Sequence, residues 1–355
     1  MNAHYIKPLT IGSVTSSPNL VLAPMSGVTN SAFRRLLREE NGDALGLVVT
    51  EFISIEALSR QAGRSIDMMK FEEYERPISI QIFGFDIDRM IVSAKIVEDA
   101  GADIIDINCG CPVPKVVRRG GGCELMRRVE HLGQLLNAVS KTVSIPLTLK
   151  IRSGWSENSI NALEVGKLAV ESGVKMLTIH GRTREQLYRG QADWEIIGNV
   201  ASQLPIPVVG SGDIVDAKSA IEGYRKGVAG LMIGRGAMEN PWVFKDIRDG
   251  LEGKEVNSRP HSEIPRMLLR YLEFLLMDMP PKGAIGKMKQ LISQSTRKIP
   301  RSNEIRRDLC REGSLDKMKK RLEEWKRGLE DDPLFVFSNE CTDGYHSPIE
   351  ESAQV

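Results

Sequence analysis

Short apolar runs rich in β-branched residues recur along the first two thirds of the chain, and amphipathic stretches separate them. Within each run the apolar residues are continuous, which is typical of parallel strands buried on both faces. The stretches between the runs repeat apolar residues every three or four positions, as helices that cover a sheet do. The runs lie at residues 19–24, 47–51, 78–84, 103–110, 146–152, 175–181, 206–212 and 229–236.

This alternation predicts one closed barrel. Eight strand and helix units within about 220 residues fit a (β/α)8 TIM barrel better than an open, doubly wound sheet. No GxGxxG motif follows the first run, which weighs against a dinucleotide-binding Rossmann unit. The gaps between the runs are also too long for hairpins. We therefore predict an α/β fold, a TIM barrel, over residues 1–250.

The periodicity changes after the barrel. Residues 250–263 combine Gly, Ser, Pro and Glu in the manner of a linker. Apolar residues then recur at helical spacing, which predicts a small all-helical domain over residues 251–330. Residues 331–355 show no periodicity, and we expect a poorly ordered tail there. The three helical segments lie at 263–279, 283–299 and 314–330.

Charge is segregated along the chain, although the net charge is only +1. The segment from Lys282 to Arg327 holds 15 Lys and Arg against 6 Asp and Glu, a difference of +9, so the remainder carries −8. A basic segment on a mildly acidic body favours a polyanionic partner, but a solvated helix face gives the same pattern. Composition alone leaves these two interpretations open.

Five cysteines, an odd number in a chain of 355 residues, do not indicate a disulfide framework. The first residues lack the pattern of a secretory leader, and no apolar run approaches the ~20 residues that span a bilayer. We therefore expect a soluble, cytoplasmic monomer with reduced thiols and no membrane contact. Cys109, Cys111 and Cys123 supply three thiols, but no nearby His completes a zinc set, so we expect no bound metal.

Polar and ionisable residues gather where the apolar runs stop. In a TIM barrel the carboxyl ends of all strands meet at one mouth, where active sites lie. Each residue alone is a weak indication, but together they predict one polar mouth. The residues are Pro24, Met25, Ser26, Glu51, Gln81, Asn108, Cys111, Lys150, Arg152, His180, Arg182, Ser211, Gly212, Asp213, Gly234 and Arg235.

Glycines flank the ends of the last two runs. The segments 210–212 (GSG) and 234–236 (GRG) occupy the two loops that commonly bind phosphate in such barrels. Glycine permits close backbone approach, and Arg235 adds a cation. One such loop could simply turn the chain, whereas two in these positions favour a phosphate-bearing ligand.

Lys150 and His180 end neighbouring strands on the same rim. A lysine at a strand end could form a Schiff base with a carbonyl substrate, as in aldolases, or it could face an electron-rich ring such as a reduced flavin. His180 shares its level with Lys150 and Gln81, which favours contact with a cofactor over a purely structural role.

The cysteines at the end of the fourth run favour acid chemistry. Pro112 and Pro114 predict a rigid loop after Gly110. A thiol with an ordinary pKa of ~8.5 is mostly protonated at neutral pH, so it can donate a proton as a general acid. A nucleophilic cysteine would need a neighbouring base or a lowered pKa, and the sequence reveals neither.

Taken together, these residues resemble the tRNA-dihydrouridine synthases, flavoenzymes that reduce uridine in tRNA. The likeness covers every strand end from Val21 to Phe244, and its most specific element is Asn-x-Gly-Cys-Pro-x-x-Lys at 108–115. The C-terminal region, with PPKGAIGKMKQL, is most similar to the bacterial B subfamily. The matching segments are APMSGVTNSAFRRL, ISIQIFG, DINCGCPVPKVVRRGGGCELMR, LTLKIRSGW, LTIHGRTREQLYRGQADW, VVGSGDI and GLMIGRGAMENPWVF.

The resemblance implies a role for each residue of the mouth. Cys111 matches the family's catalytic acid, whereas Cys109 occupies a variable position. Asn108 matches a residue that contacts the target uracil, and Lys115 and Arg182 are expected to bind the substrate. The residues that match the cofactor site are Pro24, Met25, Ser26, Gln81, Lys150, His180, Ser211, Gly212, Asp213, Gly234 and Arg235.

The implied reaction is the reduction of specific uridines in tRNA to 5,6-dihydrouridine by an FMN-dependent oxidoreductase that uses NADPH or NADH. A hydride would pass from flavin N5 to uracil C6, and Cys111 would protonate C5. The basic helices would hold the tRNA body. Ser211 departs from the family's usual Asn and can donate only one hydrogen bond where an amide donates two.

Other functions fit parts of the sequence. A barrel that acts on a free pyrimidine, like dihydroorotate dehydrogenase, shares the FMN site but leaves the basic helices unexplained. A catalytically inactive tRNA-binding protein explains those helices but not the retention of Cys111, Lys150, His180 and Arg235. A Lys150 aldolase would not need a thiol acid.

Overall fold

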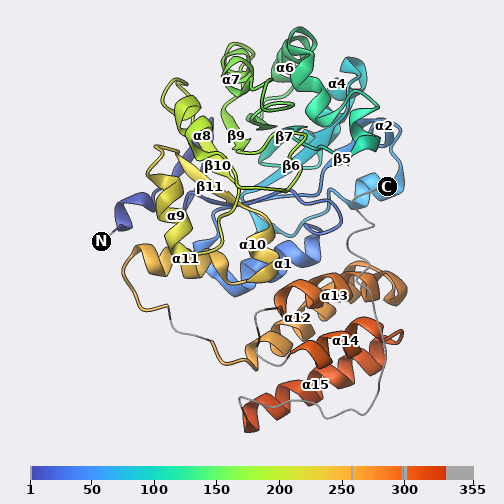
Figure 1. Cartoon of the computed structure of the whole chain (residues 1–355). Coiled ribbons are helices and arrows are strands. Elements are labelled where there is room, and N and C mark those ends of the chain that lie inside the picture. The colour runs from blue at the N-terminus through green and yellow to red at the C-terminus, as the bar shows by residue number, and fades with distance from the viewer. Residues whose placement is uncertain (1, 257–258, 298, 300–301, 333–355) are drawn as a thin grey trace.

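The computed structural model describes residues 2–256, 259–297, 299 and 302–332. Eight parallel strands follow one another in the order β4-β3-β11-β10-β9-β8-β7-β6, and the pairing of β4 with β6 closes the sheet (Figure 1). The closed sheet confirms the predicted TIM barrel, and its strands coincide with the eight apolar runs. They are β3 (Leu20–Leu22), β4 (Leu47–Val49), β6 (Ile78–Phe83), β7 (Ile104–Cys109), β8 (Leu147–Arg152), β9 (Met176–His180), β10 (Val208–Ser211) and β11 (Gly230–Ile233).

Helices cover the outside of the barrel. Several begin at an Asn or Asp whose side chain accepts a hydrogen bond from a backbone N–H of the first turn, as Asn30 does from Phe33 at 2.9 Å. The longer outer helices are α1 (Ser31–Asn41), α4 (Ile87–Asp99), α6 (Val129–Thr142), α7 (Ala162–Glu171), α8 (Trp194–Ala201), α9 (Ala217–Tyr224) and α11 (Val243–Leu251). Shorter elements are β5 (Ile53–Ser54), α2 (Ile55–Leu58), α3 (Gly63–Asp67), α5 (Pro114–Val117), α10 (Arg235–Glu239), and the 3-10 turns η1 (Ala3–Tyr5), η2 (Gly42–Ala44), η3 (Glu73–Glu75) and η4 (Gly122–Arg127).

A hairpin plugs the amino-terminal end of the barrel. Strands β1 (Leu9–Ile11) and β2 (Val14–Ser16) pair antiparallel, and the sequence analysis did not predict them. Their apolar residues are too few for a recognisable alternation. Leu9 and Ile11 belong to a buried cluster with residues from the strands, so this end of the barrel is filled with side chains. The strand residues of that cluster include Val21, Leu47, Val49, Ile104, Met176, Val209 and Met232.

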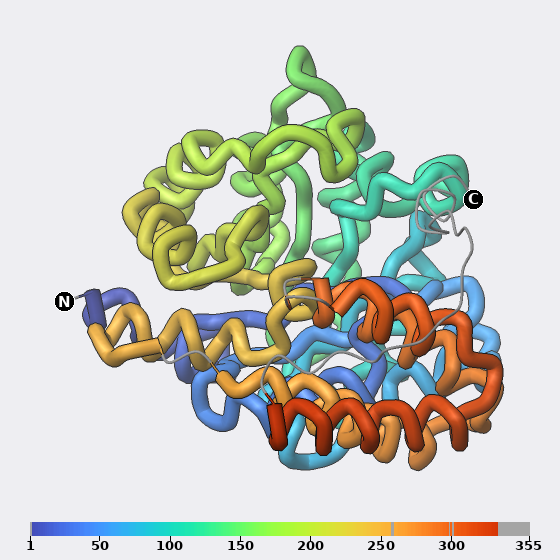
Figure 2. Tube along the Cα trace, turned by 60° about the horizontal axis from the view of Figure 1, so that its bottom comes forward, coloured from blue at the N-terminus to red at the C-terminus, as the bar shows by residue number. Residues whose placement is uncertain are grey.

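In the part of the chain that the structure describes, four helices follow the barrel, and the first of them docks against α1. Figures 1 and 2 both show them beside the N-terminal part of the chain, and α12 contacts α1 directly. Three ion pairs hold this contact, and they join Arg270 to Glu39, Arg266 to Glu40 and Asp278 to Arg35 at 2.6 to 2.8 Å. The helices are α12 (Glu263–Asp278), α13 (Pro281–Ser295), α14 (Asn303–Arg311) and α15 (Leu315–Asp331).

The C-terminal region therefore is helical, as predicted, with α14 as an additional helix. Helix α15 extends through Asp331, the first residue assigned to the tail. Residues 333–355 of that predicted tail lie outside the described residues. In the part of the chain that the structure describes, no helix combines the length and apolarity needed to cross a membrane.

One buried ion pair ties the start of α1 to η3. Arg34 Nε lies 2.6 Å from Glu75 Oε2, and both side chains are almost completely buried. The other guanidinium nitrogens donate to the carbonyls of Thr29 and Lys70, each at 2.8 Å. Glu75 Oε1 accepts from Ser31 Oγ at 2.8 Å. This network fixes the segment that leads from β3 into α1 and therefore one side of the barrel mouth.

Glu75→Ala should lower the free energy of unfolding by about 3–5 kcal/mol, because it leaves the Arg34 charge buried without its partner. Urea denaturation followed by far-UV circular dichroism measures the loss. Glu73→Ala is the matched control, since Glu73 is 85% exposed and pairs with Arg76 at the surface, and it should change stability by less than about 0.5 kcal/mol. Equal losses in the two variants would show that the buried pair does not hold this segment.

Candidate active site

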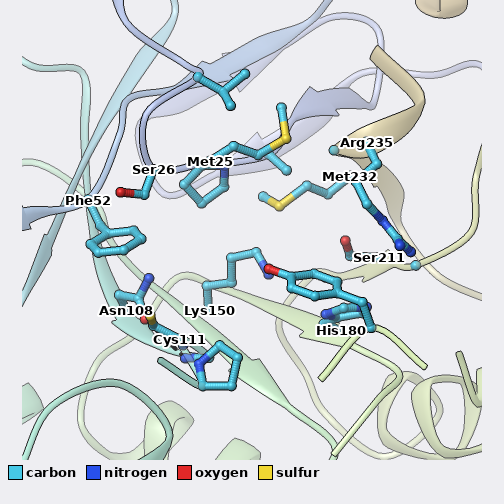
Figure 3. A pocket seen from close by; sticks show the side chains of 18 of the residues that line it. Met25, Ser26, Phe52, Asn108, Cys111, Lys150, His180, Ser211, Met232 and Arg235 are labelled. Carbon is cyan, nitrogen blue, oxygen red and sulfur yellow. Dashed lines mark hydrogen bonds between the residues drawn. The ribbon is translucent and has the colours of Figure 1, made fainter. Parts of the chain in front are cut away.

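A cavity of about 1020 Å³ opens at the carboxyl ends of the strands (Figure 3). Its wall is built from the carboxyl ends of all eight barrel strands and the loops that follow them, as the closed parallel sheet requires. The structure brings together every residue that the sequence placed in the mouth except Glu51, Gln81 and Arg182; Glu51 instead accepts from the Gly27 N–H. The expected residues in the wall are Pro24, Met25, Ser26, Asn108, Cys111, Lys115, Lys150, Arg152, His180, Ser211, Gly212, Asp213, Gly234 and Arg235.

The cavity has two chemically different ends. Figure 3 shows Arg235 and Ser211 at one end, Cys111 and Asn108 at the other, and Lys150 between them. The register of the sheet explains part of this order, because Asn108 on β7 pairs directly with Lys150 on β8. An elongated ligand could therefore meet a cation at one end and a thiol at the other.

Two polar side chains fix the backbone that carries Cys111. Asn108 Oδ1 accepts from the backbone N–H groups of Gly110 and Cys111 at 3.2 and 2.9 Å. Arg152 Nε donates to the Gly110 carbonyl at 2.9 Å. The Cys111 side chain is only 6% exposed, and burial raises the pKa of its thiol. The thiol is therefore protonated at neutral pH, as a general acid must be.

Gln81 lies behind the wall and does not line the cavity. It is fully buried one layer deeper, where it pairs in register with Asp106. Its Nε2 donates to Asp106 Oδ2, and its Oε1 accepts from Asn108 Nδ2 at 2.7 Å. The structure thus gives Gln81 a different position from the one expected for a cofactor contact. It orients the Asn108 amide, which in turn holds the Cys111 loop.

Burial sets the protonation of the two basic residues in the middle of the wall. It lowers the pKa of Lys150 to about 8, and repulsion from Arg152 adds to the effect. Burial also holds the pKa of His180 well below its ordinary value, and repulsion from the charges of Arg152 and Lys150 adds to this effect. The imidazole is therefore neutral at neutral pH. Arg182 Nη1 lies 3.4 Å from His180 Nε2, and since a guanidinium only donates, the ring proton belongs on Nδ1.

Asp213 organises the opposite end of the cavity. Its Oδ1 lies 3.3 Å from Arg235 Nη2, while its Oδ2 accepts from Arg182 Nη2 and from the Ala192 N–H, each at 2.8 Å. The preceding Gly212 has a φ of 126°, and a Cβ there would lie 2.5 Å from Ala192 Cβ, so no other residue fits. The Asp213 carboxylate is thus bound by protein groups, and it positions Arg235.

Arg182, expected to contact the substrate, also lies behind the wall. Its side chain is 2% exposed, and the carbonyls of Arg189 and Gly190 accept from it at 3.1 and 2.5 Å. With Asp213 as a third partner, its donors are directed into the protein. The structure places Arg182 as a tie between the loop after β9 and Asp213.

Tyr188 and Gln290 line the cavity, although the sequence analysis did not assign them to the site. Arg152 and Arg235 lie 5.5 and 5.1 Å from the ring centroid of Tyr188, a half-exposed residue at the rim. Arg152, which the sequence placed in the mouth two residues after Lys150, also lines the cavity. No signal in the sequence indicates Gln290, because it reaches the cavity from α13 through tertiary packing.

The cysteines show no sign of metal or disulfide chemistry within the described residues. No group of three or more His, Cys, Asp and Glu side chains among them could hold a metal ion. Cys109, Cys111, Cys123 and Cys310 are free thiols. Cys109 and Cys123 are buried, and burial raises the pKa of Cys123 to about 12, so of the three clustered thiols only Cys111 faces the cavity.

Comparison with known proteins gives a consistent result. The family model of dihydrouridine synthase matches residues 21–328. The chain is 39% identical over 270 residues to tRNA-dihydrouridine synthase B of Pseudomonas putida, which is 75% of this chain and 78% of that protein. It is 40% identical over 271 residues to a probable tRNA-dihydrouridine synthase of Rhodobacter capsulatus, covering 76% and 83%. A solved structure of morphinone reductase in complex with tetrahydroNAD has a TM-score of 0.49 at 12% identity, covering 72% of this chain and 92% of that chain, which is too distant to bear on function.

Lys150→Met should stabilise the flavin-free protein at neutral pH by about 1–2 kcal/mol, because it removes a charge that burial disfavours. As the pH rises, the folded state loses the Lys150 proton near pH 8, whereas an unfolded lysine keeps it until about pH 10.5. The penalty is therefore present in full below pH 8 and is relieved between these values. The stability difference between variant and wild type, measured by urea denaturation, should shrink across this window.

Lys167→Met is the control for that titration. Lys167 is exposed on α7, so its replacement should give a small stability difference that does not depend on pH. A Lys150→Met difference that stays constant from neutral to alkaline pH would contradict the lowered pKa.

Proposed function

The chain belongs to the dihydrouridine synthase family, and from that premise we propose that it reduces specific uridines in tRNA to 5,6-dihydrouridine with FMN as cofactor and NADPH or NADH as reductant. The observation that carries the proposal is the protonated Cys111 thiol held opposite a cationic end of one cavity. A reductase of this kind needs a phosphate site, a place for a planar ring and an aimed proton donor.

The cavity fits FMN by the chemistry of its donors. Arg235 and Ser211 offer a cation and a hydroxyl at one end, which suits a phosphate monoester. Lys150 and the neutral His180 lie toward the middle, where a partly charged lysine can stabilise negative charge on a reduced ring. No dinucleotide fingerprint accompanies this site, which favours FMN over FAD. Bound FMN supplies the hydride that NADPH or NADH provides.

Cys111 completes the reduction by moving one proton. Addition of a hydride at uracil C6 places negative charge at C5, in conjugation with O4. The Cys111 Sγ–H bond then breaks, its proton forms the new C–H bond at C5, and the thiolate regains a proton from solvent. Arg152 and Lys150 favour the charged form of Cys111, so they stabilise the thiolate that the step produces. Hydride and proton together account for the two hydrogens gained.

In this proposal the helical domain after the barrel, residues 251–330, makes the contact with tRNA. Exposed basic residues on α14 and α15 can neutralise phosphates without reading sequence. Lys115, exposed at the cavity, suits a phosphate next to the target nucleotide. The target uracil must leave its stack to enter the cavity, which is cheapest in a loop. The exposed basic residues are Arg307, Lys317, Lys319, Lys320 and Arg327.

The setting of the reaction follows from the substrate. Since tRNA modification takes place where tRNA is made and used, we place the protein in the cytoplasm, acting as a monomer. The free thiols of Cys109, Cys111, Cys123 and Cys310 are compatible with a reducing compartment.

Cys111→Ala should separate the two half-reactions. Reduction of the flavin by NADPH needs no thiol and should stay near the wild-type rate. Reduction of tRNA should fall by about 10²–10⁴-fold, the usual contribution of a positioned general acid. Stopped-flow flavin absorbance measures the first rate, and release of dihydrouridine after nuclease digestion measures the second.

Cys109→Ala is the control for this experiment, since Cys109 is buried beside the same loop but does not line the cavity. Its tRNA reduction should change by less than about tenfold, a packing effect of ~1.4 kcal/mol. An active Cys111→Ala enzyme, or one that no longer accepts hydride from NADPH, would refute the assignment of the acid.

Arg235→Ala should weaken FMN affinity by about 10–100-fold, the value of one charge-assisted contact to phosphate, while riboflavin affinity changes little. Riboflavin lacks the phosphate, so the comparison isolates the contact of Arg235. Flavin fluorescence titration of the flavin-free protein measures both constants. Arg225→Ala, at an exposed position after α9, should leave both affinities unchanged. Equal weakening of FMN and riboflavin would mean that Arg235 does not bind the phosphate.

A further inference from the structure

Helix α13 is anchored to the barrel at the edge of the cavity. It packs against α10, which begins at Arg235. Lys287 of α13 donates from Nζ to the Gly27 carbonyl and lies 3.9 Å from Glu51 Oε1, while the Gly27 N–H donates to Glu51 Oε2. The Lys287 and Glu51 side chains are only 23% and 14% exposed. These contacts fix α13 to the loop that carries residues 24–26 of the wall.

One turn beyond this anchor, Gln290 enters the cavity wall. Positions three apart share one face of a helix, so the contact of Lys287 with the barrel turns Gln290 toward the cavity. Among the described residues of α12 to α15, Gln290 is the only one that lines the cavity. Its backbone carbonyl accepts from Ser293 Oγ at 2.9 Å, but its side-chain amide makes no hydrogen bond to any described residue.

The amide of Asn108 is too fully engaged to recognise a uracil by itself. Its oxygen accepts from the N–H groups of Gly110 and Cys111, and one of its N–H bonds points to Gln81. At most one donor remains for a ligand. A uracil presents an acceptor, a donor and an acceptor along O4, N3–H and O2. Reading the N3–H requires an acceptor, which the free Gln290 amide offers together with two donors.

We propose that Gln290 is a specificity-determining residue that hydrogen-bonds the uracil N3–H and a neighbouring carbonyl of the target uridine, and that Lys287 holds α13 in the position that allows it. The proposal rests on the function proposed above. It makes the C-terminal helices part of the base-recognition site as well as a contact for phosphates. Discrimination of this type is strong, because a bound base that cannot pair covers the amide and leaves it without hydrogen-bond partners.

The test compares two tRNA substrates and two glutamine variants. One substrate carries uridine at the reduced position, once this has been mapped, and the other carries N3-methyluridine there. The wild-type protein should reduce the methylated substrate about 10–100-fold more slowly. Gln290→Leu should reduce ordinary tRNA more slowly than the wild-type protein by a similar factor. Methylation should slow this variant little further. FMN affinity, tRNA affinity and flavin reduction by NADPH should stay unchanged.

Gln294→Leu is the matched control, since Gln294 lies one turn further along α13 and outside the cavity wall. It should retain the wild-type rate and the wild-type penalty for methylation. Lys287→Met should reproduce the Gln290 defect in weaker form, and Lys287→Arg should restore part of the rate. A wild-type rate in Gln290→Leu, an undiminished methylation penalty in that variant, or a loss of FMN from it would overturn the proposal. Failure of the wild-type protein to reduce any tRNA would instead overturn the proposed function, and the two failures are therefore distinguishable.

Discussion

The parallel closure of eight strands is the constraint on which the site depends. All carboxyl ends meet at one rim, and the hairpin of β1 and β2 fills the other end with apolar side chains. Buried polar groups inside the barrel need hydrogen-bond partners. Gln81 donates to Asp106 and accepts from Asn108, which lies nearer to the rim. Asn108 in turn fixes the Cys111 loop, because its Oδ1 accepts from the Cys111 N–H. The thiol is thus aimed by a chain of hydrogen bonds that starts in the barrel core.

The sequence reveals the barrel and much of the mouth because both follow from short-range patterns. Continuous apolar runs predict buried parallel strands, and the residue after each run then lies at the mouth of the barrel. The same pattern does not distinguish the residues that line the cavity from those that lie behind them. Gln81 and Arg182 stand at strand ends like the others, yet their partners Asp106 and Asp213 draw them into the protein. Whether a rim residue faces the ligand depends on tertiary hydrogen bonds, which spacing does not encode.

The contribution of the C-terminal helices was the least predictable part. Their helical periodicity and their excess of positive charge are visible in the sequence, but the charge fits a polyanionic partner and a solvated helix face equally well. Nothing in that pattern reveals that α12 docks on α1 through ion pairs or that α13 contacts the loop after β3. Because of these contacts, α13 is tied both to the rim near Gly27 and to α10, which begins at Arg235. We infer that tRNA binding and base recognition are mechanically connected through α13.

If the proposed function is right, this cavity reduces a uridine only when tRNA presents it. The most direct measurement incubates the FMN-loaded protein and NADPH with tRNA from a strain that lacks its own dihydrouridine synthases, with free uridine in a parallel reaction. Mass spectrometry of the digested RNA then maps any uridine that has gained two hydrogens. We expect dihydrouridine at a defined position in tRNA and none from free uridine. Reduction of the free pyrimidine with none in tRNA would contradict it.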